Sequence, residues 1–271
     1  MTVITSRQNP IVARYRAAAH RDEDDVLLLD GVHLVADALA AGVRIEHVAM
    51  TDAARADPDM QELLAKLTRA GVEVAFTTTA VMDAISPVRS SSAVAALAKP
   101  PTLTGEAMYS GAHTLVVVAA DVQDPGNAGA IVRVAEAGGA TGVIASGGTA
   151  DLFGWKALRG SMGSTLRLPV VSGVDPTDAI ADAKRHGCRV IAAAPRSGRS
   201  PFDIDLTGPV AILIGGEGHG LAPALVDAAD ERVTIPMQAP VESLNAAVTA
   251  ALLVYEARRQ RSATKTRKHE T

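Results

Sequence analysis

The chain has 271 residues, enough for one large domain or two of ordinary size, and 48% hydrophobic against 21% charged residues exclude wholesale disorder. The single cysteine, Cys188, excludes an intramolecular disulfide and a cysteine-rich metal site, and we expect it to be a small buried hydrophobe. No apolar run reaches the ~18 residues of a membrane span or forms a signal sequence, so we expect a cytoplasmic protein without a membrane segment. We also expect no bound metal ion.

The net charge of −4 is unusual for an RNA-binding protein, but the charges are unevenly distributed. Four arginines, among them Arg7 and Arg14, precede the first acidic residue, and the chain after Glu256 is again mostly basic. Two interpretations stay open for the N-terminal arginines, contact with RNA phosphates or plain solvation. For the last ten residues we favour a solvated, partly frayed end.

The N-terminal third alternates between short apolar strands and helices. Strands are predicted at 26–29, 45–50, 72–76 and 93–98, and helices at about 31–42 and 58–70. This alternation predicts a small α/β domain over residues 1–98. Lys99-Pro100-Pro101, followed by Gly105 and Gly111, predicts a linker over 99–113, because Pro-Pro interrupts both helices and central strands.

The alternation restarts beyond this linker and predicts a second domain over residues 114–262. Strands are expected at 114–120, 141–145, 167–171, 188–194, 210–214 and 232–236, and helices at 128–138, 154–162, 176–186, 221–228 and 243–260. Continuous apolar strands such as Leu115–Val118 indicate a parallel sheet covered on both faces. Residues 263–271 are expected to form a disordered basic tail.

The first motif, Asp124 to Arg133, follows a predicted strand and opens a helix. Asp124, or more readily Asn127, is suited to cap that helix through its side-chain oxygen. Arg133 has apolar neighbours, which predicts a place on the inner half of the helix. An arginine there is costly unless it is paired or binds an anionic ligand, so we interpret Arg133 as functional.

The second motif, Ile214 to Leu221, is a glycine-rich turn after a buried strand. It fails the dinucleotide fingerprint, because Leu221 stands where the third glycine is required, and it lacks the lysine and hydroxyl of a phosphate loop. Glu217 would repel a pyrophosphate, so a zwitterionic ligand with a sulfonium fits better. His219 is interpreted as an exposed, incidental loop residue.

The third motif runs from Ile235 to Met237 and on to Ser243, Leu244 and Asn245 at the start of the last helix. Ser243 is an acceptable helix cap, which would leave Asn245 free to face a pocket.

Together and in this order, the three motifs resemble those of the SpoU branch of the SPOUT RNA methyltransferases. The resemblance extends to Lys156–Gly163 and Leu168–Val170, and more loosely to Ser6–Pro10 and Leu29–Gly31, which resemble the substrate-binding domain of many ribosomal RNA methyltransferases. Asp30 stands where that domain usually has glutamate, and His33 where it has arginine.

The resemblance implies an α/β fold in which an RNA-binding domain precedes a SPOUT domain with a trefoil knot, in a homodimer. It implies transfer of a methyl group from S-adenosylmethionine to a ribose 2′-hydroxyl, most readily in 23S ribosomal RNA. The implied catalytic residues are Arg133, Asn127, Glu217, Ser243 and Asn245. The implied cofactor-binding residues are Gly215, Gly216, Ile235, Met237, Leu244 and Ala246, and the implied RNA-binding residues are Arg7, Arg14 and Arg159.

Three alternatives stay open at this point. The substrate could be a transfer RNA, with the separate N-terminal domain favouring ribosomal RNA. The chain could be a non-catalytic RNA-binding or ribosome-assembly protein of the same fold. The presence of all five implied catalytic residues counts against this alternative, because a protein without catalytic activity need not keep them. A dinucleotide-dependent enzyme is disfavoured by the glycine spacing.

Overall fold

The structure is a computed structural model that describes residues 2–22, 25–103, 105–111 and 113–269. The chain divides into two compact units. The first contains Met1–Thr102 and Phe153–Arg167, and the second contains Leu103–Leu152 and Leu168–Thr271. The α/β class predicted from the sequence is confirmed in both units.

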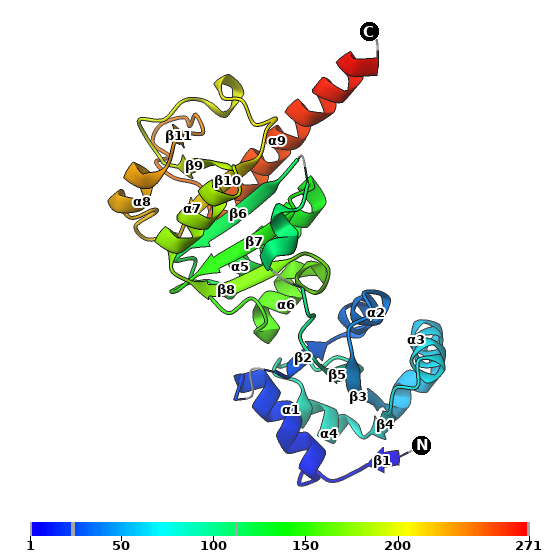
Figure 1. Ribbon diagram of the computed structural model, residues 1–271. Coiled ribbons are helices and arrows are strands. Elements are labelled where there is room, and N and C mark those ends of the chain that lie inside the picture. The colour runs from blue at the N-terminus through cyan, green and yellow to red at the C-terminus, as the bar shows by residue number, and fades with distance from the viewer. Residues whose placement is uncertain (1, 23–24, 104, 112, 270–271) are drawn as a thin grey trace. The chain divides into compact units, whose positions relative to one another are not determined.

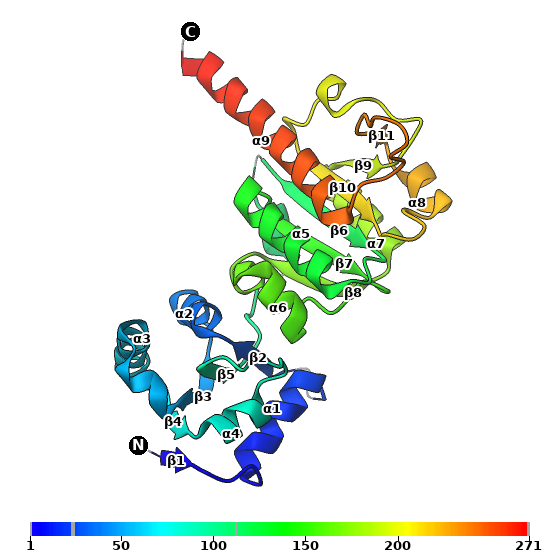
Figure 2. The ribbon, with the colours of Figure 1, turned by 180° about the vertical axis from the view of Figure 1, so that it is seen from behind.

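The first unit is a five-stranded mixed sheet in the order β1-β4-β3-β5-β2. Its elements are β1 (Thr2–Ile4), α1 (Pro10–His20), β2 (Leu27–Asp30), α2 (Val32–Ala40), β3 (Ile45–Thr51), the 3₁₀ turn η1 (Asp52–Ala56), α3 (Pro58–Arg69), β4 (Val74–Thr77), α4 (Thr79–Ile85) and β5 (Val94–Ala98). Helices α2 and α3 cover one face and α1 and α4 the other (Figures 1 and 2).

Both faces of this sheet carry apolar side chains because successive residues of a strand point to opposite sides. In β2, Leu27 and Leu29 pack with α2 and α3, whereas Leu28 packs with α1 and α4. Strand β1 and helices α1 and α4 were missed by the sequence prediction. Helix α1 is nevertheless encoded locally, since the side chain of Asn9 accepts a hydrogen bond from the backbone nitrogen of Ile11 and Pro10 follows.

The second unit is a six-stranded sheet in the order β11-β9-β10-β6-β7-β8, and every pairing between these strands is parallel. Its strands are β6 (Leu115–Ala120), β7 (Gly142–Ser146), β8 (Val170–Val174), β9 (Arg189–Ala193), β10 (Val210–Gly215) and β11 (Glu231–Val233). Its helices are α5 (Pro125–Gly138), α7 (Pro176–Arg185), α8 (Pro223–Ala228) and α9 (Ala246–His269), with 3₁₀ turns η2 (Gly105–Tyr109) and η4 (Pro201–Asp203).

Helix α7 covers one face of this sheet, while α5 and α9 lie side by side on the other (Figures 1 and 2). All six residues of β6 are buried, as the continuous apolar run predicted. Cys188 is buried beside β9, as expected. The trefoil knot that the resemblance implies stays a prediction.

Two segments lie elsewhere than the predicted domain boundaries. Residues 153–167, with helix α6 (Trp155–Ser161) and the 3₁₀ turn η3 (Ser164–Leu166), belong to the first unit, where Leu158 and Leu166 join its core. Part of the predicted linker forms η2, whose Met108 is fully buried in the core of the second unit. Helix α9 continues to His269, through most of the predicted tail, and residues 270–271 lie outside the described residues.

Candidate active site

The first two motifs meet at the carboxyl edge of the parallel sheet. Strands β10 and β6 are neighbours, and their last residues, Gly215 and Ala120, are paired in register. The loops that follow these strands therefore begin side by side. This edge is where open α/β sheets bind their ligands.

The glycine-rich loop after β10 approaches other backbone too closely for side chains. A Cβ atom on Gly216 would lie 1.9 Å from the carbonyl oxygen of Asp121, and one on Gly215 would lie 2.3 Å from the carbonyl carbon of Gly220. The loop closes through a hydrogen bond of 3.1 Å from the backbone nitrogen of Gly220 to the carbonyl oxygen of Gly216. These glycines therefore permit a tight turn against the β6–α5 loop.

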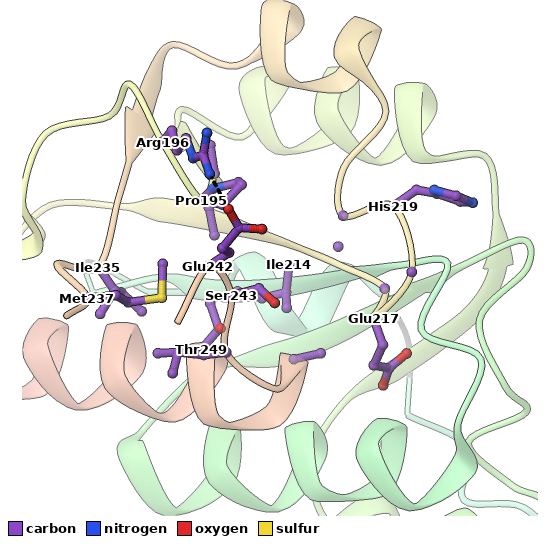
Figure 3. Close-up of a pocket in the computed structure, with 18 of the residues that line it drawn as sticks. Pro195, Arg196, Ile214, Glu217, His219, Ile235, Met237, Glu242, Ser243 and Thr249 are labelled. Carbon is purple, nitrogen blue, oxygen red and sulfur yellow. Dashed lines mark hydrogen bonds and ion pairs between the residues drawn. The ribbon is translucent and has the colours of Figure 1, made fainter. Parts of the chain in front are cut away.

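A cavity of about 350 Å³ lies among this loop, the end of β9 and the segment that precedes α9 (Figure 3). Its size is typical of small-molecule sites. All six predicted cofactor-binding residues line it: Gly215, Gly216, Ile235, Met237, Leu244 and Ala246. Two predicted catalytic residues, Glu217 and Ser243, also line it.

Asn127, Glu217 and Asn245 form a chain of side-chain hydrogen bonds that joins all three motifs. The Nδ2 group of Asn245 donates to Oδ1 of Asn127 at 2.9 Å, and Nδ2 of Asn127 donates to Oε1 of Glu217 at 2.5 Å. Because a carboxylate only accepts, its contact with Asn127 orients the amide, whose oxygen then faces Asn245. The structure thus brings together three of the five predicted catalytic residues.

Of the two caps considered for α5, Asp124 is confirmed and the preferred Asn127 was wrong, and the predicted cap of the last helix, Ser243, was also wrong. Helix α5 is capped by Asp124, whose Oδ1 accepts a hydrogen bond of 2.8 Å from the backbone nitrogen of Asn127. Helix α9 begins at Ala246 and is capped by Asn245, whose Oδ1 accepts from the backbone nitrogens of Ala247 and Val248. Asn245 therefore uses its oxygen for the helix and its NH₂ group for Asn127, while Ser243 is left exposed at the cavity.

Arg133 lies on the exposed side of α5, so its predicted place on the inner half of the helix was wrong. The buried side is formed by Ile131, Val132 and Ala135, and the helical twist of about 100° per residue carries position 133 out of it. Within the described parts of the chain, the Arg133 guanidinium forms no hydrogen bond or ion pair. It is therefore available to an external anion.

Several cavity residues were not foreseen from the sequence. They are Ala193, Ala194, Pro195, Arg196, Val233, Glu242 and Thr249. Ala193 is the last residue of β9 and the next three residues follow that strand, which lies next to β10 in the sheet, but strand order is not readable from one sequence. His219 borders the cavity and is exposed, as expected, and its side chain points away from the cavity (Figure 3).

The three predicted RNA-binding arginines belong to the first unit, and each has an intramolecular partner. Arg7 donates through Nε to the carbonyl oxygen of Ala80 at 2.9 Å, and Arg14 forms an ion pair of 3.0 Å with Glu46. Arg159 donates through Nη1 to Asp30 at 3.0 Å, and the side chain of Asp30 is completely buried. Arg159 thus neutralises a buried carboxylate, and its contact with RNA stays a prediction.

Among the residues that the structure describes, no group of three or more histidine, cysteine, aspartate or glutamate side chains is arranged to hold a metal ion. In the same residues, no helix combines the length and apolar character needed to cross a membrane.

Comparison with known proteins assigns both parts of the chain. The sequence model of the SpoU rRNA Methylase family matches residues 114–255, and that of the MRM3-like substrate binding domain matches residues 12–96. The chain belongs to the SpoU rRNA methylase family. The resemblance inferred from the three motifs is therefore confirmed, and with it membership in a family of RNA methyltransferases.

Individual members of the SpoU family match nearly the whole chain. The 23S rRNA (guanosine(2553)-2'-O)-methyltransferase RlmP of Bacillus subtilis is 30% identical over 238 residues, which is 88% of this chain and 90% of that one. The crystal structure of an RNA 2'-O ribose methyltransferase is 33% identical, with a TM-score of 0.83 over 96% of this chain and 100% of that one. An AdoMet-bound rRNA methyltransferase from Sinorhizobium meliloti is 30% identical, with a TM-score of 0.84 over 95% and 97%.

Proposed function

We propose that this protein transfers a methyl group from S-adenosylmethionine to a ribose 2′-hydroxyl of ribosomal RNA, with 23S RNA as the substrate. The hydrogen-bonded chain from Asn245 through Asn127 to Glu217, beside a glycine-lined cavity, is the observation that carries this proposal. The names of its relatives support it, since the Bacillus subtilis and Sinorhizobium meliloti proteins are described as rRNA methyltransferases and the latter was solved with AdoMet.

The cavity fits S-adenosylmethionine by its chemistry. Ile235, Met237 and Leu244 provide apolar wall for an adenine ring, and Gly215 and Gly216 line the same cavity. Backbone groups near Ala246, the remaining predicted cofactor-binding residue, also line the cavity. The cofactor, when bound, supplies a methyl group on a positively charged sulfur, which agrees with the failed phosphate-binding patterns of the glycine loop.

The protein's own part in the reaction is to align a weak nucleophile and to stabilise it as its proton leaves. Alignment of a hydroxyl with its reaction partner removes several kcal/mol of barrier. Asn127 is assigned to orient the ribose hydroxyl, because Glu217 and Asn245 fix both ends of its amide. Ser243 is assigned to position the ribose or the adjoining loop from the cavity wall.

Arg133 is assigned to the RNA phosphate and to the developing alkoxide. A guanidinium is not deprotonated in proteins, so it acts here as a fixed positive charge rather than as a base. Its exposed and unpaired position among the described residues leaves all its donors available to RNA.

Ribosomal RNA is favoured over transfer RNA by the N-terminal unit. Residues 12–96 match a substrate-binding domain, and the match to the Bacillus subtilis 23S rRNA enzyme covers 88% of this chain. Arg7, Arg14 and Arg159 are assigned to RNA contact within this unit. The cytoplasm, where such RNA would be modified, is the proposed compartment.

We also assign the protein to a homodimer. Helix α9 carries three exposed apolar side chains, Val248, Leu252 and Tyr255, with exposures of 46, 47 and 49%. Their spacing of four and three residues places them on one face of the helix. A second copy of the chain is proposed to cover this apolar face, as the family resemblance implies.

The proposal is tested by transfer of labelled methyl from S-adenosylmethionine to deproteinised RNA from a strain that lacks this gene. The RNA is sized and digested, so that label on ribose and label on base are separated. Ribose label in large ribosomal RNA is the expected result. Ribose label in transfer RNA would overturn the substrate, and base label would overturn the reaction. An absence of label from both deproteinised RNA and isolated ribosomal particles would favour the non-catalytic alternative.

A further inference from the structure

Arg196 and Glu242 form an ion pair at the edge of the cavity that the proposed mechanism does not use. Arg196 lies just beyond the end of β9, and Glu242 lies in the segment before α9. The Nη2 atom of Arg196 is 2.7 Å from Oε1 of Glu242, and both side chains are about three-quarters exposed, at 74 and 76%. The two side chains meet above Ser243, on the opposite side of the cavity from Glu217 (Figure 3).

The pair also borders a second cavity, of about 390 Å³, which adjoins the first. Arg196 and Glu242 line both cavities, as do Pro195, Ile235 and Met237. A ligand that fills the first cavity and extends past the pair therefore has room for a further group. The ion pair stands at the point where that group would lie.

Arg196 and Glu242 are the charged side chains of this cavity that a ligand can contact. Among the described residues that line the first cavity, the aspartate, glutamate, lysine and arginine side chains are Arg196, Glu217 and Glu242. The carboxylate of Glu217 accepts from Asn127 and points away from the other two (Figure 3). The pair therefore presents one cation and one anion, next to each other, at the edge of the cavity.

An exposed ion pair of this kind is easily exchanged for a ligand. It contributes little to stability, because solvent screens both charges and two long side chains must be held in place. A guanidinium binds a carboxylate through two parallel N–H···O hydrogen bonds, and a glutamate binds an ammonium group in the same charge-assisted way. The charges thus complement an α-amino acid group, which carries both a carboxylate and an ammonium.

We propose that Arg196 binds the α-carboxylate, and Glu242 the α-ammonium, of the amino-acid part of S-adenosylmethionine. This assignment rests on the proposed function. The two residues then determine specificity for the complete cofactor over nucleosides that lack the amino-acid part. In the ligand-free protein the pair neutralises itself, and the ligand replaces each partner by a group of the same charge.

The test compares two ligands by calorimetric titration of the full-length protein. S-adenosylhomocysteine carries the amino-acid group, and 5′-methylthioadenosine lacks it. The variants are Arg196→Met, which keeps the apolar stem, and Glu242→Gln, which keeps the shape. Arg199→Met is the matched control, because Arg199 is an exposed arginine of the same segment that pairs with Glu231 and lines neither cavity.

We expect both variants to bind S-adenosylhomocysteine about tenfold more weakly or worse, and 5′-methylthioadenosine within about twofold of wild type. The control should change neither affinity. An equal loss of affinity for both ligands would contradict the assignment and indicate that the ion pair only stabilises the loops. Unchanged affinities would also contradict it. A wild-type protein that binds neither ligand would instead overturn the proposed function, and this assignment with it.

Discussion

At the scale of single residues, the first unit contains a buried polar pair whose charge state matters for stability. The hydroxyl of Tyr15 lies 2.9 Å from Nδ1 of His47, and both residues are buried. Burial lowers the pKa of His47 from 6.5, the nearby Arg14 lowers it further, and Glu73 opposes the shift. The folded protein therefore favours the neutral imidazole.

We expect the first unit to lose stability as the pH falls through about 6.5. In that range the unfolded chain binds a proton that the folded chain takes up only at lower pH, so the free energy of unfolding decreases on acidification. His47→Gln should flatten this dependence between pH 7.5 and 5.5. Fluorescence of Trp155, the one tryptophan, reports on this unit during thermal melting, because it packs against the same core cluster. An identical slope in the variant would contradict the assignment.

Arg159 is expected to have a structural effect separate from any role in RNA binding. Its removal leaves the fully buried carboxylate of Asp30 with only the Ser86 hydroxyl as a side-chain partner among the described residues. Because the Arg159 side chain is 45% exposed, we expect Arg159→Ala to cost about 2 kcal/mol of unfolding free energy rather than the full value of a buried pair. Urea denaturation measures this change in the free energy of unfolding. Arg14→Ala, at a more exposed pair, should cost less than about 1 kcal/mol.

At the scale of elements, the glycine loop after β10 offers a matched pair of substitutions. A Cβ atom at Gly216 would collide with the carbonyl oxygen of Asp121, whereas one at Gly218 would meet nothing within 4 Å. We expect Gly216→Ala to abolish binding of S-adenosylhomocysteine and lower the melting temperature, because backbone rather than a movable side chain must shift. Gly218→Ala should change affinity less than about threefold. Equal affinities in the two variants would show that the tight turn is not required.

The same elements indicate how far local pattern predicts a site. The loops after β6 and β10 were identifiable because each follows a buried apolar strand and contains turn residues. The sequence could not choose the correct helix caps, because Asp124, Asn127, Ser243 and Asn245 are all acceptable caps by residue type. Only tertiary contact decides between them, as when Glu217 and Asn245 hold the side chain of Asn127.

At the scale of the whole molecule, the sequence predicted two α/β parts, and one segment of the predicted second domain packs with the first compact unit. Residues 153–167 continue the regular alternation of the second part, yet they pack in the first. The apolar character of Leu158 and Leu166 predicts that they are buried, but it does not predict which of the two cores they join. The order of strands in the second sheet could not be predicted from the sequence either. For that reason the sequence did not predict that residues 193–196 line the cavity.

Oligomeric state is testable through the apolar face of α9. We expect Leu252→Glu to shift the mass in solution from that of a dimer to that of a monomer, because a charge would be buried against the second copy. Light scattering after size exclusion measures the mass. Phe202→Glu replaces another exposed apolar residue, on η4, and should leave the mass unchanged. A wild-type monomer would contradict the proposed dimer.

The most direct test of the proposed reaction is the rate of methyl transfer by Arg133→Ala, measured in single turnover on the RNA that accepts label from the wild-type protein. The affinity for S-adenosylhomocysteine is measured on the same samples. Arg185→Ala, at an exposed arginine of α7, is the control. We predict a rate about 100-fold or more below wild type with cofactor affinity unchanged, since one fixed donor to a developing oxyanion is lost. Near-full turnover by Arg133→Ala with normal cofactor binding would contradict the account.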